Sequence, residues 1–251
     1  MYNDILKIGP LTIHGYGLMI GIGVIVALVV AAKRIKKRGL DTDFLYGLGF
    51  VSLVFGFIGA KLLYCIVEIE AFLNEPMRVL SGSGFVLYGG IIGGILAAMV
   101  YCKYKKVNFF EYFDLAVPSV AIAQGFGRIG CFLAGCCYGR ETDSCIGIMF
   151  HNSSIASNGI KLIPTQLFSS AGNFLIALVL LLYARNNRKT GKVGALYLIL
   201  YSVGRFIIEF FRNDYRGNVG VLSTSQFISL LILAIGIAMF FAKELPWPKE
   251  R

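Results

Sequence analysis

The chain has 251 residues, of which 57% are hydrophobic and only 15% are charged, and its formal net charge is +10. Soluble domains carry about 25% charged residues, so this composition argues against a soluble globular protein. It indicates a membrane protein whose positive charge reflects topology and contact with anionic lipid rather than nucleic acid.

Seven apolar segments recur along the chain, each near or above the roughly 18 residues that a membrane-spanning helix needs. In chain order they lie at about 11–32, 44–69, 85–102, 112–135, 164–184, 193–211 and 222–242. The first is too long for a cleavable signal peptide and has no basic stretch before it. We therefore expect an all-α polytopic membrane protein with about seven transmembrane helices. It would form a single transmembrane domain over 1–251, with an extracytoplasmic excursion at about 138–163.

Basic residues follow the first, third, fifth and seventh segments, which all end on the same side. Only Lys7, Arg78, Arg140, Lys161, Arg212 and Arg216 fall on the opposite side. The positive-inside rule then places the N-terminus outside and the C-terminus in the cytoplasm. The 15 basic residues on the cytoplasmic side, of 24 in all, are Lys33, Arg34, Lys36, Lys37, Arg38, Lys103, Lys105, Lys106, Arg185, Arg188, Lys189, Lys192, Lys243, Lys249 and Arg251.

Lys61, Arg128 and Arg205 lie inside predicted segments rather than between them. Each segment runs outward and each cation falls beyond its midpoint, so all three are expected at similar depth in the outer half of the bilayer. Cations inside a membrane are costly and usually functional, although a long side chain can also reach the surface and an ion pair can be purely structural. Glu209 follows Arg205 by four residues, on the same helical face. Three cations at one depth with one nearby acid favour a polar cavity for an anionic lipid phosphate.

Residues at the outer ends of two segments fit a cavity open to that face. His14 and Tyr16 begin the first segment, and Tyr88 begins the third within a glycine-rich stretch. The tyrosines are also explained as interfacial aromatic residues, and the glycines as sites of close helix packing. His14 would be a natural titrating group beside the cavity, although exposed terminal histidines usually have no role.

Several motifs in a fixed order carry a resemblance to one known family. Residues 127–135 read Gly-Arg-Ile-Gly-Cys-Phe-Leu-Ala-Gly, which resembles the signature of prolipoprotein diacylglyceryl transferases. Further motifs are His-x-Tyr-Gly at 14–17, Tyr-Gly-Gly-x-x-Gly at 88–93, Pro-Thr-Gln-Leu at 164–167, the stretch 201–212 and Leu-Ser-Thr-Ser-Gln at 222–226. The resemblance thus covers nearly the whole chain.

The resemblance implies a multi-pass enzyme of the bacterial plasma membrane with its active site towards the outer face. The family moves the diacylglyceryl group of phosphatidylglycerol onto the lipobox cysteine thiol of a preprolipoprotein and releases glycerol phosphate. The implied partners are phosphatidylglycerol, a lipobox-containing preprolipoprotein and membrane lipids. No cofactor, metal or nucleic acid is expected.

The resemblance also implies roles for individual residues. Arg128 and Arg205 match the essential arginines of the family and would bind the lipid phosphate, with Lys61 as a further cation. Glu209 would orient Arg205, and Tyr16 matches a tyrosine that hydrogen-bonds in the site. The reaction needs the charge of the departing phosphate to be stabilised and the incoming thiol to lose its proton.

The chain departs from the family pattern at five positions. These are Tyr88 in place of a histidine, Cys131 in place of an asparagine, Cys136 and Ser169 in place of acids, and Lys61 in place of an arginine. The general base is therefore open between His14, Tyr88 and deprotonation assisted by the substrate. The changes fit a cysteine-bearing subgroup with the same reaction, or a paralogous lipid-modifying transferase with a different acceptor. A non-catalytic phospholipid-binding transporter would also keep the basic cavity.

Six cysteines have no single explanation. Cys65 and Cys102 are expected to be small core residues. Four others lie close together near the outer face, in the pattern Cys-x4-Cys-Cys-x7-Cys that begins at Cys131 and ends at Cys145. A disulfide from Cys136 or its neighbour to Cys145, a metal site, a covalent role for Cys131 or Cys136, and simple packing all remain open.

Overall fold

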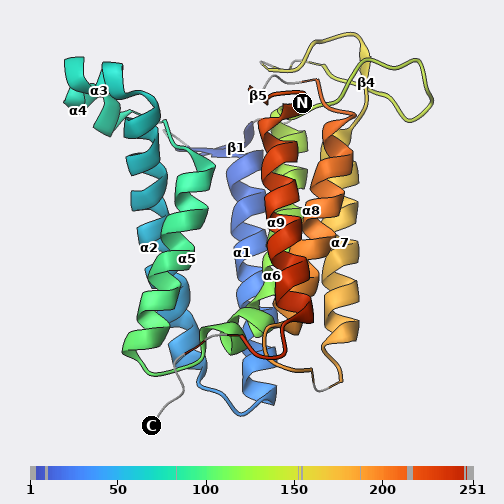
Figure 1. Cartoon of the computed structure of the whole chain (residues 1–251). Coiled ribbons are helices and arrows are strands. Elements are labelled where there is room, and N and C mark those ends of the chain that lie inside the picture. The colour runs from blue at the N-terminus through green and yellow to red at the C-terminus, as the bar shows by residue number, and fades with distance from the viewer. Residues whose placement is uncertain are drawn as a thin grey trace. The chain divides into compact units, whose positions relative to one another are not determined.

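The computed structural model describes residues 4–8, 11–82, 84–151, 153, 155–186, 188–213, 217–245 and 247. Arg216, Lys249 and Arg251, which enter the charge argument above, lie outside these residues. Within them the helices are α1 (Gly15–Lys37), α2 (Thr42–Val67), α3 (Ile69–Asn74), α4 (Pro76–Ser81), α5 (Leu87–Tyr104), α6 (Phe109–Ala134), α7 (Thr165–Tyr183), α8 (Lys192–Glu209) and α9 (Thr224–Phe241) (Figure 1). Three short antiparallel pairs join β1 (Asp4–Ile8) to β2 (Leu11–His14), β3 (Ile148–Met149) to β4 (Lys161–Leu162), and β5 (Asn218–Val219) to β6 (Leu222–Ser223).

Each predicted apolar segment coincides with one long helix, which confirms an all-α polytopic membrane protein. Among the described residues, six helices have the length and apolar composition to cross a membrane: α1, α2, α5, α6, α7 and α9. The remaining long helix, α8, corresponds to the sixth predicted segment. It does not reach that composition because its 18 residues include Lys192, Arg205 and Glu209. By length and composition, six helices therefore qualify as membrane spans, where the sequence predicted about seven. Whether α8 is also compatible with a membrane depends on which groups neutralise its charges.

The chain divides into two compact units. The first contains Met1–Arg34 and Phe113–Leu245, and the second contains Ile35–Tyr112 and Pro246–Arg251. In the second unit α2 packs against α5 through glycines. A Cβ atom added at Gly59 or Gly89 would collide with the backbone of the facing helix. Because lipid offers little hydrophobic drive between helices, such close backbone approach is what holds a pair together. The glycine-rich start of α5 is thus explained by packing.

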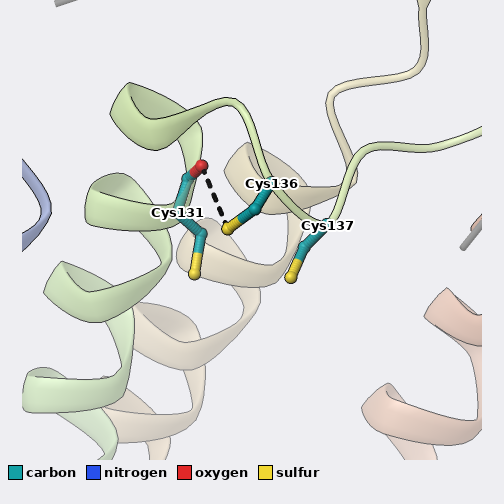
Figure 2. Close-up of side chains that lie close together, drawn as sticks. All are labelled: Cys131, Cys136 and Cys137. Carbon is teal, nitrogen blue, oxygen red and sulfur yellow. Dashed lines mark hydrogen bonds between the residues drawn. The ribbon is translucent and has the colours of Figure 1, made fainter. Parts of the chain in front are cut away.

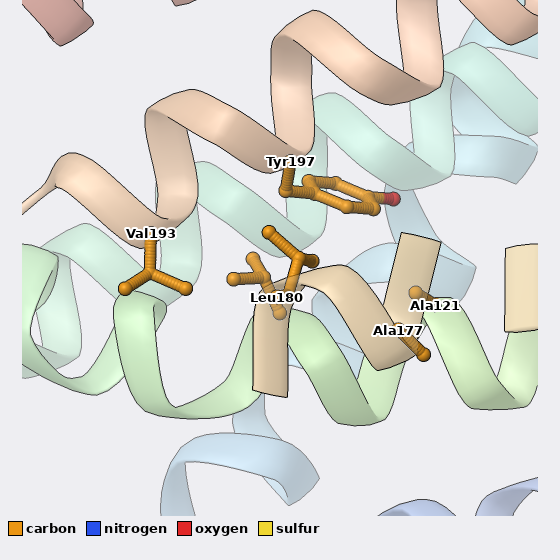
Figure 3. Close-up of a cluster of buried hydrophobic side chains, with 6 residues drawn as sticks. Ala121, Ala177, Leu180, Val193 and Tyr197 are labelled. Carbon is orange, nitrogen blue, oxygen red and sulfur yellow. The ribbon is translucent and has the colours of Figure 1, made fainter. Parts of the chain in front are cut away.

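The core of the first unit lies where α6, α7 and α8 meet. Figure 3 shows Ala121 from α6, Ala177 and Leu180 from α7, and Val193 and Tyr197 from α8 in one cluster. Ala121 and Leu180 are fully buried. These small and medium apolar residues let the three helices pack closely. The packing sets how far each helix is shifted along its neighbours, and so which polar side chains on α6, α7 and α8 face one another.

Polar contacts tie the N-terminus of α8 to its neighbours in the first unit. Asp114 of α6 accepts hydrogen bonds from the backbone N–H groups of Gly191, at 2.6 Å, and Gly194, at 2.7 Å. A carboxylate at a helix N-terminus satisfies otherwise unpaired donors and opposes the helix dipole. Lys192 donates in turn to the carbonyl of Ala242 at the end of α9, at 2.7 Å. One of the three charges that lower the hydropathy of α8 is therefore used as a helix cap.

The expected excursion at about 138–163 has a small core of its own. Phe150 and Leu162 are buried at 0% and 1% exposure, and Phe132 from the end of α6 packs against them. The segment also joins the residues that follow α8, since Arg140 N donates to Phe211 O at 2.9 Å. It is therefore a folded insertion anchored at the ends of α6 and α8.

Candidate active site

A buried ion pair lies near the end of α8. Arg205 Nη1 is 2.7 Å from Glu209 Oε2, and the two side chains are 11% and 7% exposed. The expectation that both lie on one helical face is met by this geometry. A buried cation is tolerated when a carboxylate and further hydrogen bonds compensate for its lost hydration.

The start of α9 supplies those further hydrogen bonds. Arg205 Nη2 donates to Ser225 Oγ at 2.9 Å, and Ser223 Oγ donates to Glu209 Oε1 at 3.0 Å. Ser223 is also the N-cap of α9. Its hydroxyl accepts from Gln226 N, while Gln226 Oε1 accepts from Ser223 N. This reciprocal capping box fixes the backbone of the turn and so sets both serine hydroxyls against the ion pair.

The two serine contacts were not predicted from the sequence. The signal was present as Ser-Thr-Ser-Gln at the start of the seventh apolar segment, because Ser-x-x-Gln before an apolar run is a capping-box pattern. That pattern predicts the helix start. It does not predict which neighbouring helix the serine hydroxyls face.

A cavity of about 110 Å³ brings the two arginines together within the first unit. Arg128 reaches it from α6 and Arg205 from α8, and Ser169 and Asn173 line it from α7. Asn173 is only 6% exposed, and as an amide inside an apolar segment it could have been noticed for the same reason as the arginines. The remaining lining residues are Phe168, Gly172, Ile176, Tyr201, Gly204 and Ile208.

Ser169 lines this cavity, whereas Tyr16 does not. Ser169, which replaces a family acid, donates its hydroxyl to Thr165 O at 2.7 Å, so it supplies no charge to the cavity wall. Tyr16 of α1 packs at Gly130 of α6, where an added Cβ would lie 3.2 Å from the tyrosine ring. Tyr16 is 45% exposed and lies within electrostatic range of Arg128. The structure thus brings Tyr16 near Arg128 without placing it in the cavity lining.

His14, Lys61 and Tyr88 are not among the residues that line the cavity. His14 ends β2 and is exposed. Lys61 and Tyr88 belong to the second unit, where Tyr88 is partly exposed in the first turn of α5. Lys61 Nζ donates to the carbonyls of Gly82, at 2.7 Å, and Gly84, at 3.2 Å. The charge of Lys61 is thus occupied by the loop before α5, which favours the structural explanation over phosphate binding.

Three cysteines gather where α6 ends. The sulfur atoms of Cys131, Cys136 and Cys137 all lie within 4.8 Å of one another (Figure 2). Cys145 is exposed and is not part of this group, so only three of the four cysteines near the expected outer face come together in the described residues. The six cysteines, all within the described chain, make no disulfide with one another. Cys65 and Cys102 are buried, as expected.

The loop that carries two of these thiols is fixed by α7. Thr165 Oγ1 donates to Cys137 O and Gln166 Nε2 donates to Cys136 O, each at 2.7 Å. Both donors are 1% exposed. The Pro-Thr-Gln-Leu motif thus has a clear structural role, which is to hold the cysteine loop against the first turn of α7.

Hydrogen bonding within the group distinguishes the two loop thiols. The Cys131 side chain raises the pKa of Cys136 and lowers the pKa of Cys137, and the Arg212 guanidinium beside Cys137 lowers it further. Cys137 is therefore where negative charge is most favoured in the loop, because a thiolate there accepts hydrogen bonds and faces a cation.

A family model described as prolipoprotein diacylglyceryl transferase matches residues 3–242. The chain belongs to the prolipoprotein diacylglyceryl transferase family. A phosphatidylglycerol–prolipoprotein diacylglyceryl transferase of Clostridium tetani is 52% identical to it, over 92% of this chain and 93% of that protein. A second transferase of that name from Clostridium perfringens is 48% identical over 97% and 96% of the two chains. The Staphylococcus aureus transferase is 30% identical over 98% and 95%.

Family membership confirms the resemblance drawn from the motifs. The signature at 127–135 lies on the last part of α6 and carries Arg128, and the stretch 201–212 carries the Arg205–Glu209 pair. Both therefore contribute to the same cavity in this member of the transferase family.

Proposed function

We propose that the chain transfers the diacylglyceryl group of phosphatidylglycerol to the lipobox cysteine thiol of a prolipoprotein and releases glycerol phosphate. The observation that carries this proposal is the cavity that Arg128 and Arg205 share, in a chain about half identical to transferases of that name. The cavity holds several water-sized groups, and its two cations suit a phosphodiester.

The two arginines bind and stabilise the phosphate as it departs. The acceptor sulfur forms a bond to the glyceryl carbon while the C–O bond to phosphate breaks, and the electron pair of that bond leaves on the phosphate oxygen. Preorganised cations lower the energy of this developing charge. Glu209 and Ser225 keep Arg205 from relaxing away, because each holds one of its terminal nitrogens.

Tyr16 is proposed as a hydrogen-bond donor at the mouth of the site, next to Arg128. The acceptor thiol must lose its proton before it attacks. His14 and Tyr88 are the sequence-derived proposals for a base, and transfer of the proton to the departing phosphate is the third. The whole chain, 1–251, acts as one functional domain in the plasma membrane, with the cavity towards the outer face as the distribution of basic residues predicts.

The proposal is tested with purified protein in phosphatidylglycerol liposomes and a lipobox peptide. Mass spectrometry of the peptide should show a thioether-linked diacylglyceryl group, and the same peptide with serine in place of cysteine should remain unmodified. A modified membrane molecule other than the peptide would instead identify a paralogue with a different acceptor. Binding of the lipid without any product would identify a transporter.

A further inference from the structure

The geometry of the three thiols matches the needs of a metal ion. A zinc ion binds thiolate sulfur at about 2.3 Å, so two sulfurs in a tetrahedral site stand about 3.8 Å apart. The sulfur atoms of Cys131, Cys136 and Cys137 already lie within 4.8 Å of one another (Figure 2). Closing the set on an ion therefore requires the sulfur–sulfur distances to shorten by about 1 Å at most.

The backbone turns sharply between the end of α6 and the two neighbouring cysteines of the loop. Gly135 has φ 71° and Cys137 has φ 64°, and the left-handed conformation is uncommon for a residue other than glycine. Such a conformation costs about 1 kcal/mol or more and persists when surrounding contacts impose it. Thr165 and Gln166 hold the loop at this point, because they donate to the carbonyls of Cys137 and Cys136.

The charges around the group suit an anionic thiolate site. The guanidinium of Arg212 lies beside Cys137, and Arg128 acts electrostatically on Cys131. Three thiolates and one divalent cation carry a net charge of −1, which one neighbouring arginine is enough to neutralise. Sulfur ligands select thiophilic ions such as Zn²⁺ over Mg²⁺ or Ca²⁺. Three protein ligands also leave the fourth tetrahedral position open, as in catalytic rather than structural zinc sites.

We propose that Cys131, Cys136 and Cys137 bind one thiophilic divalent cation of the zinc type, whose open fourth position takes the acceptor thiol. The second part rests on the proposed function. On binding, the acceptor thiol gives its proton to water, because coordination to such an ion deprotonates a thiol. The sulfur electron pair then forms the S–C bond, the C–O bond to phosphate breaks, and its electron pair leaves on glycerol phosphate.

The position of the group supports this role. Cys131 follows Arg128 by three residues on α6, so the two side chains lie on the same side of that helix. Because a bound cation of this kind deprotonates the coordinated thiol, it would replace the separate base that the sequence left open.

Metal binding is measured first, without reference to activity. Purified protein is reduced, treated with chelator, incubated with Zn²⁺ or Co²⁺ and desalted. We expect one ion per chain, a thiolate-to-Co²⁺ charge-transfer band, and protection of these three cysteines, but not Cys145, from alkylation. Cys137→Ser should lose the ion, whereas Cys145→Ser should keep it. Equal metal content in these two variants, or a disulfide among the three cysteines in freshly isolated protein, would overturn the site.

The Cys137→Ser variant could lose the ion because it fails to fold. Protection of the three cysteines by Zn²⁺ is therefore also measured in the unmutated protein, which needs no substitution. The transfer assay then separates the two proposals. A more than about tenfold loss of transfer on chelation, restored by Zn²⁺, supports the thiol-binding role. Undiminished transfer by metal-free protein overturns that role and leaves the transferase function standing. One ion per chain without any lipobox product supports the site and removes the transferase function.

Discussion

At the scale of single residues, the proposed phosphate site depends on how Arg205 and Arg128 are held. Arg205 is fixed by Glu209 on its own helix and by Ser225 on α9, and both arginines line one cavity. The sequence predicted the Arg205–Glu209 pair. It could not predict that Lys61, at a similar expected depth, is occupied by the carbonyls of Gly82 and Gly84, because that depends on a loop before α5.

Replacing either cavity arginine by alanine should lower the turnover of lipobox peptide at least 100-fold. Each substitution removes a fixed donor from the departing phosphate. Steady-state kinetics with phosphatidylglycerol and peptide measure the effect. The matched control is Arg140→Ala, since Arg140 is exposed in the folded insertion and should keep normal turnover. Near-normal turnover in both cavity variants would refute the phosphate-binding role.

The buried ion pair should matter for stability far more than an exposed one. Glu209→Gln leaves a buried cation without its counter-charge and should cost about 3 kcal/mol of unfolding free energy. Glu75→Gln is the control. Glu75 pairs with Arg78 at 3.0 Å, but these side chains are 59% and 82% exposed, so the cost there should stay below about 1 kcal/mol. Unfolding by denaturant in detergent compares them; equal costs would contradict the account.

At the scale of helices, the length of each apolar segment predicted a helix reliably. The side-chain contacts between helices could not be predicted in the same way. All seven predicted segments became long helices, yet α8 alone falls short of a membrane-spanning composition. Its charges are satisfied by neighbours: Lys192 by the end of α9, and Arg205 and Glu209 by each other and by serines. Glu209 is four residues from Arg205 and was predicted, whereas Ser223, Ser225 and Ala242 lie 14 or more residues from the side chains they contact, so no local pattern identifies them. The same holds for the cysteines, which only the loop held by α7 brings together.

Close packing of α2 on α5 predicts opposite effects at two glycines of the same helix. A Cβ at Gly59 would meet the backbone of α5, so Gly59→Ala should destabilise the protein by about 1–3 kcal/mol. A Cβ at Gly49 meets nothing within 4 Å, so Gly49→Ala should be neutral or stabilising by up to about 1 kcal/mol, because alanine favours helix. Thermal unfolding in detergent distinguishes them, and equal shifts would show that this interface does not limit stability.

At the scale of the whole molecule, the distribution of basic residues predicts how the chain crosses the membrane. The loop after α7 and the end of α1 are basic, whereas the folded insertion at 138–163 carries only Arg140 and Lys161. The positive-inside rule then predicts that the insertion, and the ends of α6 and α8 to which it is anchored, lie on the outer side.

Labelling of intact cells tests that orientation. A membrane-impermeant thiol reagent should modify Cys145, which is exposed in the insertion, before the cells are permeabilised. A cysteine placed at Asn186 in the basic loop after α7 should react only afterwards. The reverse order would place the proposed active site on the cytoplasmic face.

One measurement directly tests whether the protein transfers a diacylglyceryl group from phosphatidylglycerol to a lipobox thiol. Purified protein is incubated with phosphatidylglycerol and a lipobox peptide, and both products are quantified from the same sample. The account predicts thioether-linked diacylglyceryl peptide and glycerol phosphate in equal amounts, and neither product with Arg128→Ala. Phosphatidylglycerol that is bound but recovered intact, under conditions where the Clostridium tetani relative modifies the peptide, would contradict it.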